Sequence, residues 1–425
     1  MTMIKKEEIS WNPVLNKVIE IKRKYLTFFK TIDYSYTEEL TCVERWIREI
    51  GDLDNLALFR FLKLVQKDNL VLFRYANYAD IYSEDEDITS DELWNMSNGF
   101  YKECRSVVID VRKEEIVLAP FRKFFNINER AETSYEAIQN RINNASTVEF
   151  SDKLDGSMQS ATWYDGKIIM AGSQSLDPKS SWRLEDGYKY ISDRRYVNMI
   201  KSKPEYTFIF EYISLKDAHV VKYKTADQGL HLIGIRDKRD GTELDYKTIL
   251  SYAFTWQIPS TSVFNKTLDE VMSELDAKKS NEAEGFVINI DNFKVKVKYN
   301  DYVKLHKILS KLSSVNLIIH SIADDTYDDV LSKLPLAYHS QVEDIAKQVF
   351  YYLKIAENNI NKWYEKAPKN SRKEFMIWVE KNVPKIYRGF CREKFLGKKY
   401  NLIKTHDKEP RYKKMPELKL YERGN

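Results

Sequence analysis

The feature that most constrains the fold is a central stretch, from Leu70 to Tyr299, of short segments rich in β-branched and aromatic residues. Turn residues separate these segments, which read LVLFRYANYA, SVVIDV, EIVLAPF, TVEF, KIIMAG, YTFIFEYISL, LHLIGI, GFVINI and FKVKVKY. Segments of this length and composition predict strands, and short turns between them favour antiparallel pairing. The sequence therefore predicts a large antiparallel β-region with a few helices, such as one over SYEAIQNRI.

Both flanks of this β-region have helical periodicity. Residues 13–66 and the chain after about residue 303 repeat apolar residues at intervals of three and four. A chain of 425 residues is expected to hold two or three domains. We therefore predict an α+β protein, with a β-rich domain over residues 1–306 that includes a helical lead-in over 1–68. An all-α domain is predicted over residues 307–425.

Composition excludes several classes of protein. The three cysteines are far apart and the six histidines have no metal-ligand spacing, which argues against a disulfide framework, a zinc ribbon and a metal hydrolase. The first residues, MTMIKKEEIS, lack the apolar core of a signal peptide, and no apolar run approaches the roughly 20 residues of a membrane span. We expect a cytoplasmic protein, a monomer, with no membrane partner.

Charge is distributed unevenly along the chain. From Lys362 to the end there are 19 Lys and Arg against 8 Asp and Glu, although the whole chain has a net charge of only +4. A basic end on a slightly acidic body favours a polyanion such as nucleic acid as its partner, and a lysine-rich solvated surface is the alternative. Most aromatic residues of this end are expected in a helical core.

The segment KLDG, residues 153–156, allows two interpretations. It is good turn chemistry, so a solvated hairpin turn is one of them. The other is a nucleophilic Lys153 that attacks the α-phosphate of a nucleoside triphosphate. The amine must then be neutral, and we expect burial and nearby cations to lower its pKa.

Such a nucleophile needs carboxylates for a metal ion and for ribose, and two glutamates fit. Glu211 is the single charge inside the apolar strand YTFIFEYISL, and Glu284 stands beside a glycine at the start of GFVINI. A buried carboxylate requires a partner, so a structural ion pair is the alternative interpretation.

Phosphate binding needs cations on the same pocket. At strand period two, Lys294, Lys296 and Lys298 share one face, although a lysine-protected edge strand has the same pattern. A two-residue turn between the last two strands would put Glu284 on the opposite face from Lys296 and Lys298. We therefore predict an odd register, produced by a three-residue turn or by a bulge near Gly285.

Taken together, these motifs resemble the ATP-dependent RNA ligase 1 family of T-even phages, within the covalent nucleotidyltransferases. The resemblance covers roughly residues 70–306 and rests on LFRYANYAD, ECRS, FRKFFNINE, KLDGS, FIFEY, EGFVI and KVKYNDYVKLH. It implies ATP and Mg²⁺ (or Mn²⁺) as cofactors, RNA as partner, and a role in RNA repair. A tRNA with a broken anticodon loop is the substrate that the family implies.

The resemblance also implies roles for individual residues. Lys153 would be adenylylated, Asp155 would order its loop, and Phe125 would stack near the nucleotide. The remaining roles are metal binding by Glu284, contact with ribose or metal by Glu211, and phosphate binding by Arg105, Lys123, Lys296 and Lys298.

Two departures from the family pattern and three alternatives accompany this hypothesis. Ser106 stands where the family has glycine, and IIMAGSQSL lacks an expected lysine, leaving Gly172, Ser173 and Ser175. A DNA ligase, an mRNA-capping guanylyltransferase and a non-catalytic RNA-binding relative are the alternatives. The first two usually append an oligonucleotide-binding barrel, whereas the segment after residue 306 has helical periodicity.

Overall fold

The computed structural model describes residues 10–76, 94, 99–216, 221–275, 282–300, 302–303, 318–319, 321–322, 327, 331, 336–398 and 402. The chain divides into two compact units, Met1–Val303 and Lys304–Asn425. The predicted boundary at residue 306 lies outside the described residues. None of the helices in the described ranges is long and apolar enough to cross a membrane.

The first unit begins with helices α1 (Pro13–Phe29), α2 (Cys42–Ile50) and α3 (Leu53–Phe59). A four-stranded sheet follows, in the order β1 (Leu62–Lys67), β2 (Leu70–Tyr75), β3 (Arg105–Asp110) and β4 (Glu115–Leu118), all antiparallel. Helix α6 (Phe100–Glu103) leads into β3. The prediction of a helical lead-in up to residue 68 was therefore wrong for its last residues, which form strand β1. Residues 62–67 pair with β2 in a hairpin that Asp68, with a φ of 53°, helps to close.

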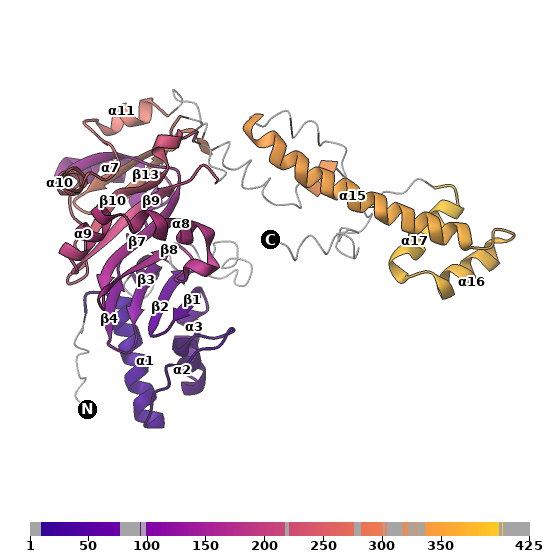
Figure 1. Ribbon diagram of the computed structural model, residues 1–425, viewed down its shortest axis with the longest axis horizontal. Helices are drawn as coiled ribbons and strands as arrows, with labels where there is room; N and C mark the ends of the chain where they lie inside the picture. The colour runs from indigo at the N-terminus through magenta and orange to yellow at the C-terminus, as the bar shows by residue number, and fades with distance from the viewer. Residues whose placement is uncertain are drawn as a thin grey trace. The chain divides into compact units, whose positions relative to one another are not determined.

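Both faces of this first sheet are buried, which explains its continuous apolar runs. Val71 and Phe73 face the core shared with α1 and α2, whereas Leu72 faces a second cluster with Ile169 and Ala171 of β8 (Lys167–Gly172). This alternation is the strand period of two. The first sheet therefore packs between the N-terminal helices and the next sheet (Figure 1).

Two further sheets complete the first unit. One has the order β10 (Gly229–Asp237), β9 (Tyr206–Ile213), β7 (Ser157–Tyr164) and β8. The other has the order β11 (Val263–Phe264), β6 (Val148–Asp152), β12 (Gly285–Ile290), β13 (Phe293–Lys298) and β5 (Phe125–Asn126), in which only β13–β5 is parallel. The predicted antiparallel α+β fold is confirmed.

Helices cover one face of the β9 sheet. Phe208, Phe210 and Tyr212 of β9 pack in a cluster with α8 (Trp182–Ile191), α9 (Arg194–Ser202) and α10 (Tyr246–Trp256). Strand parity then directs Glu211 to the opposite face, away from these helices. Two more helices of this unit are α7 (Tyr135–Asn144) and α11 (Leu268–Ser273).

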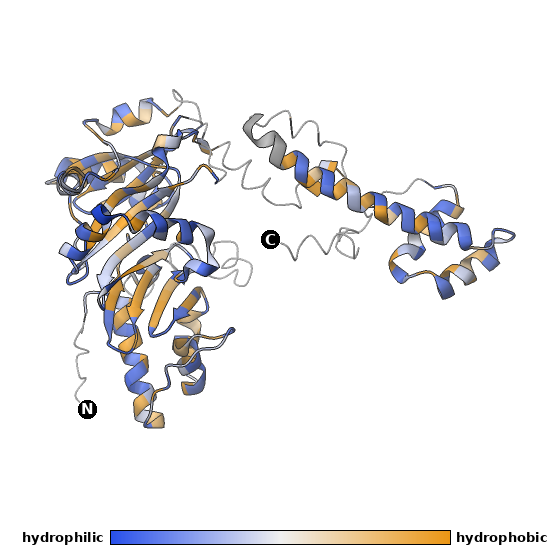
Figure 2. Cartoon of the chain, viewed as in Figure 1, coloured by the Kyte–Doolittle hydropathy of each residue, from blue (hydrophilic) through white to orange (hydrophobic). Residues whose placement is uncertain are grey.

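The described part of the second unit consists mainly of helices α15 (Leu336–Lys366), α16 (Arg372–Asn382) and α17 (Lys385–Phe395). Buried Phe375, Tyr387 and Phe390 form its core, and partly buried aromatics pack against them: Trp363, Tyr364 and Trp378. Within the described residues of this unit, the predicted helical character and the predicted core role of these aromatics are confirmed. The helices have polar and apolar faces (Figure 2).

Candidate active site

Lys153 follows β6 directly and is held by the neighbouring strand. Its backbone N–H donates to the carbonyl of Gly285 at 2.9 Å, which extends the β6–β12 ladder by one residue. Gly156 lets the loop approach β9, because a Cβ there would lie 2.6 Å from the Tyr212 carbonyl oxygen. The loop is therefore fixed at both ends, and Lys153 is directed into a cavity of about 130 Å³.

Asp155 fixes this loop from within. Its carboxylate accepts hydrogen bonds from the Val221 backbone N–H and the Tyr302 hydroxyl, both at 3.1 Å, and its own N–H donates to the Tyr223 hydroxyl at 2.7 Å. The aspartate is buried. Its position is that of a residue that orders the loop, and its negative charge helps to raise the pKa of Lys153.

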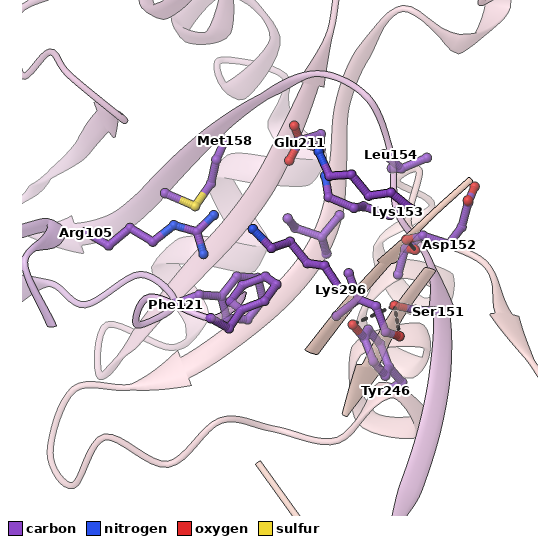
Figure 3. Close-up of a pocket in the computed structure, with 15 residues that line it drawn as sticks. Arg105, Phe121, Ser151, Asp152, Lys153, Leu154, Met158, Glu211, Tyr246 and Lys296 are labelled. Carbon is purple, nitrogen blue, oxygen red and sulfur yellow. Dashed lines mark hydrogen bonds between the residues drawn. The ribbon is translucent and has the colours of Figure 1, made fainter. Parts of the chain in front are cut away.

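The cavity has two ends of different charge (Figure 3). At what we call the carboxylate end, Lys153 lies beside Glu211, and Glu284 pairs with Lys153 and Lys298. At what we call the cationic end, Arg105 and Lys296 point towards one another above the aromatic rings of Phe121 and Phe124.

Glu284 joins the two lysines of the carboxylate end. Its Oε2 lies 2.7 Å from Lys153 Nζ, and its Oε1 lies 2.8 Å from Lys298 Nζ. Glu284 is only 3% exposed. The prediction that Glu284 and the strand lysines share one site is therefore met for Lys298.

The predicted register was nevertheless wrong. β12 and β13 pair regularly through a two-residue turn at Asp291 and Asn292, with Gly285 opposite Lys298. What brings Glu284 to the lysine face is Gly285, whose φ of 150° breaks the pleat without a bulge. A Cβ on Gly285 would lie 2.0 Å from the Val297 carbonyl oxygen, so no other residue fits.

The electrostatics of Lys153 also differ from expectation. Burial lowers the pKa of this lysine, but the charges of Glu284 and Glu211 outweigh burial, so its pKa is raised above the ordinary value. The neighbouring cations that were expected to lower the pKa of Lys153 instead lower the pKa of Lys296. Without a ligand, Lys153 is a charged member of an ion pair and not yet a nucleophile.

The cationic end has the opposite character. Arg105 and Lys296 lie 4.8 and 5.3 Å from the centre of the Phe124 ring. No carboxylate of the described residues lies within ion-pair distance of either. Burial, with the charges of Lys123 and Arg105, lowers the pKa of Lys296 to about 6. A bound phosphate would supply the missing negative charge.

Glu211 lines the same cavity from β9. Burial raises the pKa of Glu211 to about 7, against the opposing charge of Lys153. A carboxyl group with this pKa exchanges a proton near neutral pH. It can therefore accept a hydrogen bond, donate one, or take up a proton at the carboxylate end.

Two predicted nucleotide contacts lie outside this cavity. The Lys123 ammonium lies 5.2–5.3 Å from the ring centres of Tyr75, Trp94 and Phe125, and both Lys123 and Phe125 line a neighbouring pocket. Phe125 is 3% exposed, so the predicted stacking of this ring on a nucleotide is corrected. Its neighbour Phe124 faces the cavity instead.

Ser106, which stands where the family pattern has glycine, adopts a backbone conformation that glycine favours. Ser106 has a φ of 71°, a conformation that favours glycine, and it is skipped in the β2–β3 register, where Phe73 pairs with Val107 and Arg74 with Arg105. It is therefore a bulge residue that aims Arg105 at the cavity. Its hydroxyl donates to the Ser173 carbonyl at 2.8 Å.

Several cavity residues were not predicted: Phe121, Ser151, Met158, Tyr246 and Thr261. Ser151 donates to the Tyr246 hydroxyl at 2.7 Å, which links β6 to α10. These five are uncharged, and the sequence has no signal that separates them from core residues. Asp152, at the end of β6, also lines the cavity and was not predicted. Gly172 and Ser175 hydrogen-bond to one another through backbone atoms outside the cavity lining.

The cavity fits a hard divalent cation only together with a phosphate ligand. No group of three metal-ligating side chains occurs among the described residues. Asp152 and Glu211 line the cavity, and Glu284 pairs with Lys153 beside it, which matches the way Mg²⁺ binds through one or two carboxylates plus substrate phosphates.

Comparisons with known proteins agree with this chemistry. The family model described as RNA ligase matches residues 103–302. A curated protein of Thermovibrio ammonificans named "Putative RNA ligase" is 25% identical over 312 residues, which cover 69% of this chain and 77% of the relative.

Two solved structures match parts of this chain. The Naegleria gruberi RNA ligase with PPi is 17% identical, with a TM-score of 0.35, and the match covers 44% of this chain and 57% of that one. An archaeal ATP-dependent RNA ligase is 11% identical, with a TM-score of 0.41, and the match covers 78% of this chain and 86% of that one. The chain thus spans less than two thirds of the Naegleria protein. TM-scores this low support no functional argument. Residues 103–302, which contain Lys153 and both ends of its cavity and make up just under half of the chain, match the RNA ligase family model.

Proposed function

We propose that the chain is an ATP-dependent RNA ligase that joins an RNA 5′-phosphate to a 3′-hydroxyl through a lysyl-AMP formed on Lys153. The observation that carries this proposal is the cavity itself. A lysine held by carboxylates faces two cations, Arg105 and Lys296, that have no carboxylate within ion-pair distance in the described chain. This arrangement suits a nucleotide whose phosphates bind the cations while its α-phosphate faces the lysine.

The first step, the transfer of AMP to Lys153, would form one bond and break one bond. The neutral Lys153 amine attacks the α-phosphate, a P–N bond forms, and the bond to the β-phosphate breaks with release of pyrophosphate. The proton of Lys153 must leave first, and Glu211, with its pKa near 7, is able to accept it. Arg105 and Lys296 would hold the phosphate oxygens as negative charge shifts to the leaving group.

The next steps return the lysine. An RNA 5′-phosphate oxygen attacks the α-phosphorus of lysyl-AMP and releases Lys153, and a 3′-hydroxyl then attacks the activated 5′-phosphate and expels AMP. A Naegleria gruberi RNA ligase variant has been solved with ATP and Mn, and ATP with Mg²⁺ or Mn²⁺ is what we propose here. The metal ion, held by Glu284 and Glu211, would supply neutralising charge at the phosphates.

The test is covalent labelling by ATP that carries a label in its α-phosphate, with labelled GTP in parallel. We expect label from ATP only, none in Lys153→Ala, and full labelling in the control Lys247→Ala, whose side chain is exposed on α10. Lys153→Ala should still seal RNA that already carries a 5′-adenylyl group. Label from GTP would favour a capping guanylyltransferase, and no label from either would favour a non-catalytic relative.

We further propose that the helical C-terminal unit binds RNA by its phosphates. Five of its aromatic residues pack in or against its core, namely Trp363, Tyr364, Trp378, Tyr387 and Phe390, whereas cations such as Arg372, Lys373 and Lys381 are exposed on α16. Phosphate contacts make binding salt-dependent, with a slope of roughly 0.7 per contact for single strands. A chain ending at Val303 should label with ATP but bind RNA with a shallower salt slope. An unchanged slope would contradict RNA binding by this unit.

As the biological role of the ligase, we propose repair of a tRNA with a broken anticodon loop.

A further inference from the structure

A second cavity, of about 230 Å³, lies beside the first and shares Phe124 with it. We call it the lateral pocket. Five basic side chains line it: Lys102, Arg122, Lys123, Arg141 and Lys294. Because one aromatic ring forms a wall of both cavities, a chain that leaves the active site past Phe124 enters the lateral pocket.

Only part of this positive charge is neutralised within the pocket. Its two carboxylates are each used once: Glu132 pairs with Lys102 at 3.1 Å, and Glu243 pairs with Lys294. Three cations remain, so the lining has an excess of three positive charges.

The three remaining cations have weak partners or none. Arg122 lies 3.6 Å from Glu103, but Glu103 already accepts two hydrogen bonds from Arg236, at 2.9 and 3.2 Å. For Lys123 and Arg141, no ion pair is formed with any carboxylate of the described chain. Cations that outnumber the carboxylates of a hollow form a binding site for an anion.

Aromatic rings separate these cations. Arg141, exposed on α7, lies 4.1 Å from the centre of the half-buried Phe293 ring, and the Phe124 ring lines both cavities. Pyrophosphate is recognised by cations alone, whereas a single nucleic acid strand brings phosphates and bases together. The alternation of cations and rings therefore favours a polynucleotide over the tail of a nucleotide.

We propose that the lateral pocket binds a backbone phosphate of the RNA strand whose end lies in the active site, with Arg141 as its main determinant. This inference rests on the proposed ligase function. Arg141 lies outside every motif in the sequence, and its exposed guanidinium can form two hydrogen bonds to one phosphate. The triphosphate has its own cations in Arg105 and Lys296.

The experiment compares wild type with Arg141→Ala, Arg141→Lys and the control Arg194→Ala, an exposed arginine at the start of α9 outside both cavities. The probe is a single-stranded RNA with a 5′-adenylyl group, whose sealing needs no ATP. We expect Arg141→Ala to bind and seal it about tenfold less well, as for one charge-assisted hydrogen bond. The salt slope should fall by about 0.7. Arg141→Lys should keep the slope, since it keeps the charge.

Labelling by ATP separates the possible failures. If wild type takes no label from ATP, the ligase function fails and not this site. If wild type labels and Arg141→Ala seals the adenylylated RNA with an unchanged salt slope, the proposal is overturned. It is also overturned if Arg141→Ala lowers ATP labelling alone, because the pocket then holds the nucleotide tail.

Discussion

The two ends of the active-site cavity contain similar lysines in opposite states. At the carboxylate end, Lys153 and Lys298 pair with Glu284, and the pKa of Lys153 is raised. At the cationic end, Lys296 lies on the same strand face as Lys298 but near Arg105, and its pKa is lowered to about 6.

The two ends differ in whether the protein itself neutralises their charges: the carboxylate end has its own ion pairs, whereas the cationic end needs a bound anion. The carboxylate end is satisfied by its own ion pairs, and it must lose a proton before Lys153 could react as proposed. The cationic end is strained until a phosphate arrives, because buried like charges repel each other. In the proposed function, a nucleotide would therefore gain most of its binding energy at Arg105 and Lys296, and the carboxylates would keep Lys153 protonated until it reacts.

The largest expected effect comes from Lys296→Met. Adenylylation should fall at least about 100-fold, as for the loss of a group that stabilises developing charge, while the melting temperature should rise. The unfolded chain binds a proton that folded Lys296 lacks between about pH 6 and its ordinary pKa of 10.5. Wild-type stability therefore increases with pH in this window, and the gain from methionine should shrink between about pH 7 and 9.

Lys298→Met, two residues along the same strand face, is the matched comparison. Here the melting temperature should not rise, because the substitution removes an ion pair with Glu284 and not an uncompensated charge. Thermal unfolding of the two variants at both pH values checks the contrast. A higher melting temperature for Lys298→Met than for Lys296→Met would refute the distinction between the two ends.

Glu284→Gln should convert the carboxylate end into a second cationic end. Stability should fall by about 2 kcal/mol, because two partly buried lysines lose their partner. Adenylylation should fall roughly 10- to 100-fold with loss of a proposed metal ligand. The pKa of Lys153 should also fall, so the rise of the remaining activity with pH should move to lower pH. A pH profile with an unmoved rising limb would contradict the role of Glu284.

Gly285→Ala tests how Glu284 reaches the lysines. The φ of 150° and the 2.0 Å approach to Val297 leave no room for a methyl group, so the strand must shift. We expect a loss of about 2 kcal/mol or more in stability and about tenfold in adenylylation, measured by thermal unfolding and ATP labelling. Retention of both would mean that another feature places Glu284.

Ser106→Gly should have the smallest effect. Glycine relieves the backbone strain at a φ of 71°, but it removes the hydrogen bond to Ser173, and each contributes about 1 kcal/mol. Stability should therefore change by less than about 1 kcal/mol, and labelling should be nearly unchanged. A large loss of labelling would show that the serine hydroxyl, and not the bulge, positions Arg105.

Much of this site could be predicted because its chemistry leaves strong signals in sequence. A lone carboxylate in an apolar strand, Glu211, and lysines at period two, Lys296 and Lys298, stand out against their neighbours. The strands are equally visible, since β-branched runs between turn residues have few other uses.

The remainder depends on geometry that a sequence does not encode locally. Gly285 reverses the facing of Glu284 by one backbone angle, so counting residues gave the wrong face. Phe124 and Phe125 are identical residues next to one another, and the loop directs only Phe124 into the active-site cavity. The pKa of Lys153 depends on Glu284, 131 residues away in the chain. In each case a long-range contact decides what a local pattern leaves open.

The central claim is that Lys153 is the nucleophile although Lys296 has the lower pKa. Its most direct test is to incubate the protein with ATP and Mg²⁺, digest it, and locate the AMP adduct by mass spectrometry. The account predicts one adduct, on the peptide that contains Lys153, and none on the strand of Lys296 and Lys298. An AMP adduct on Lys296, with Lys153 unmodified, would contradict it.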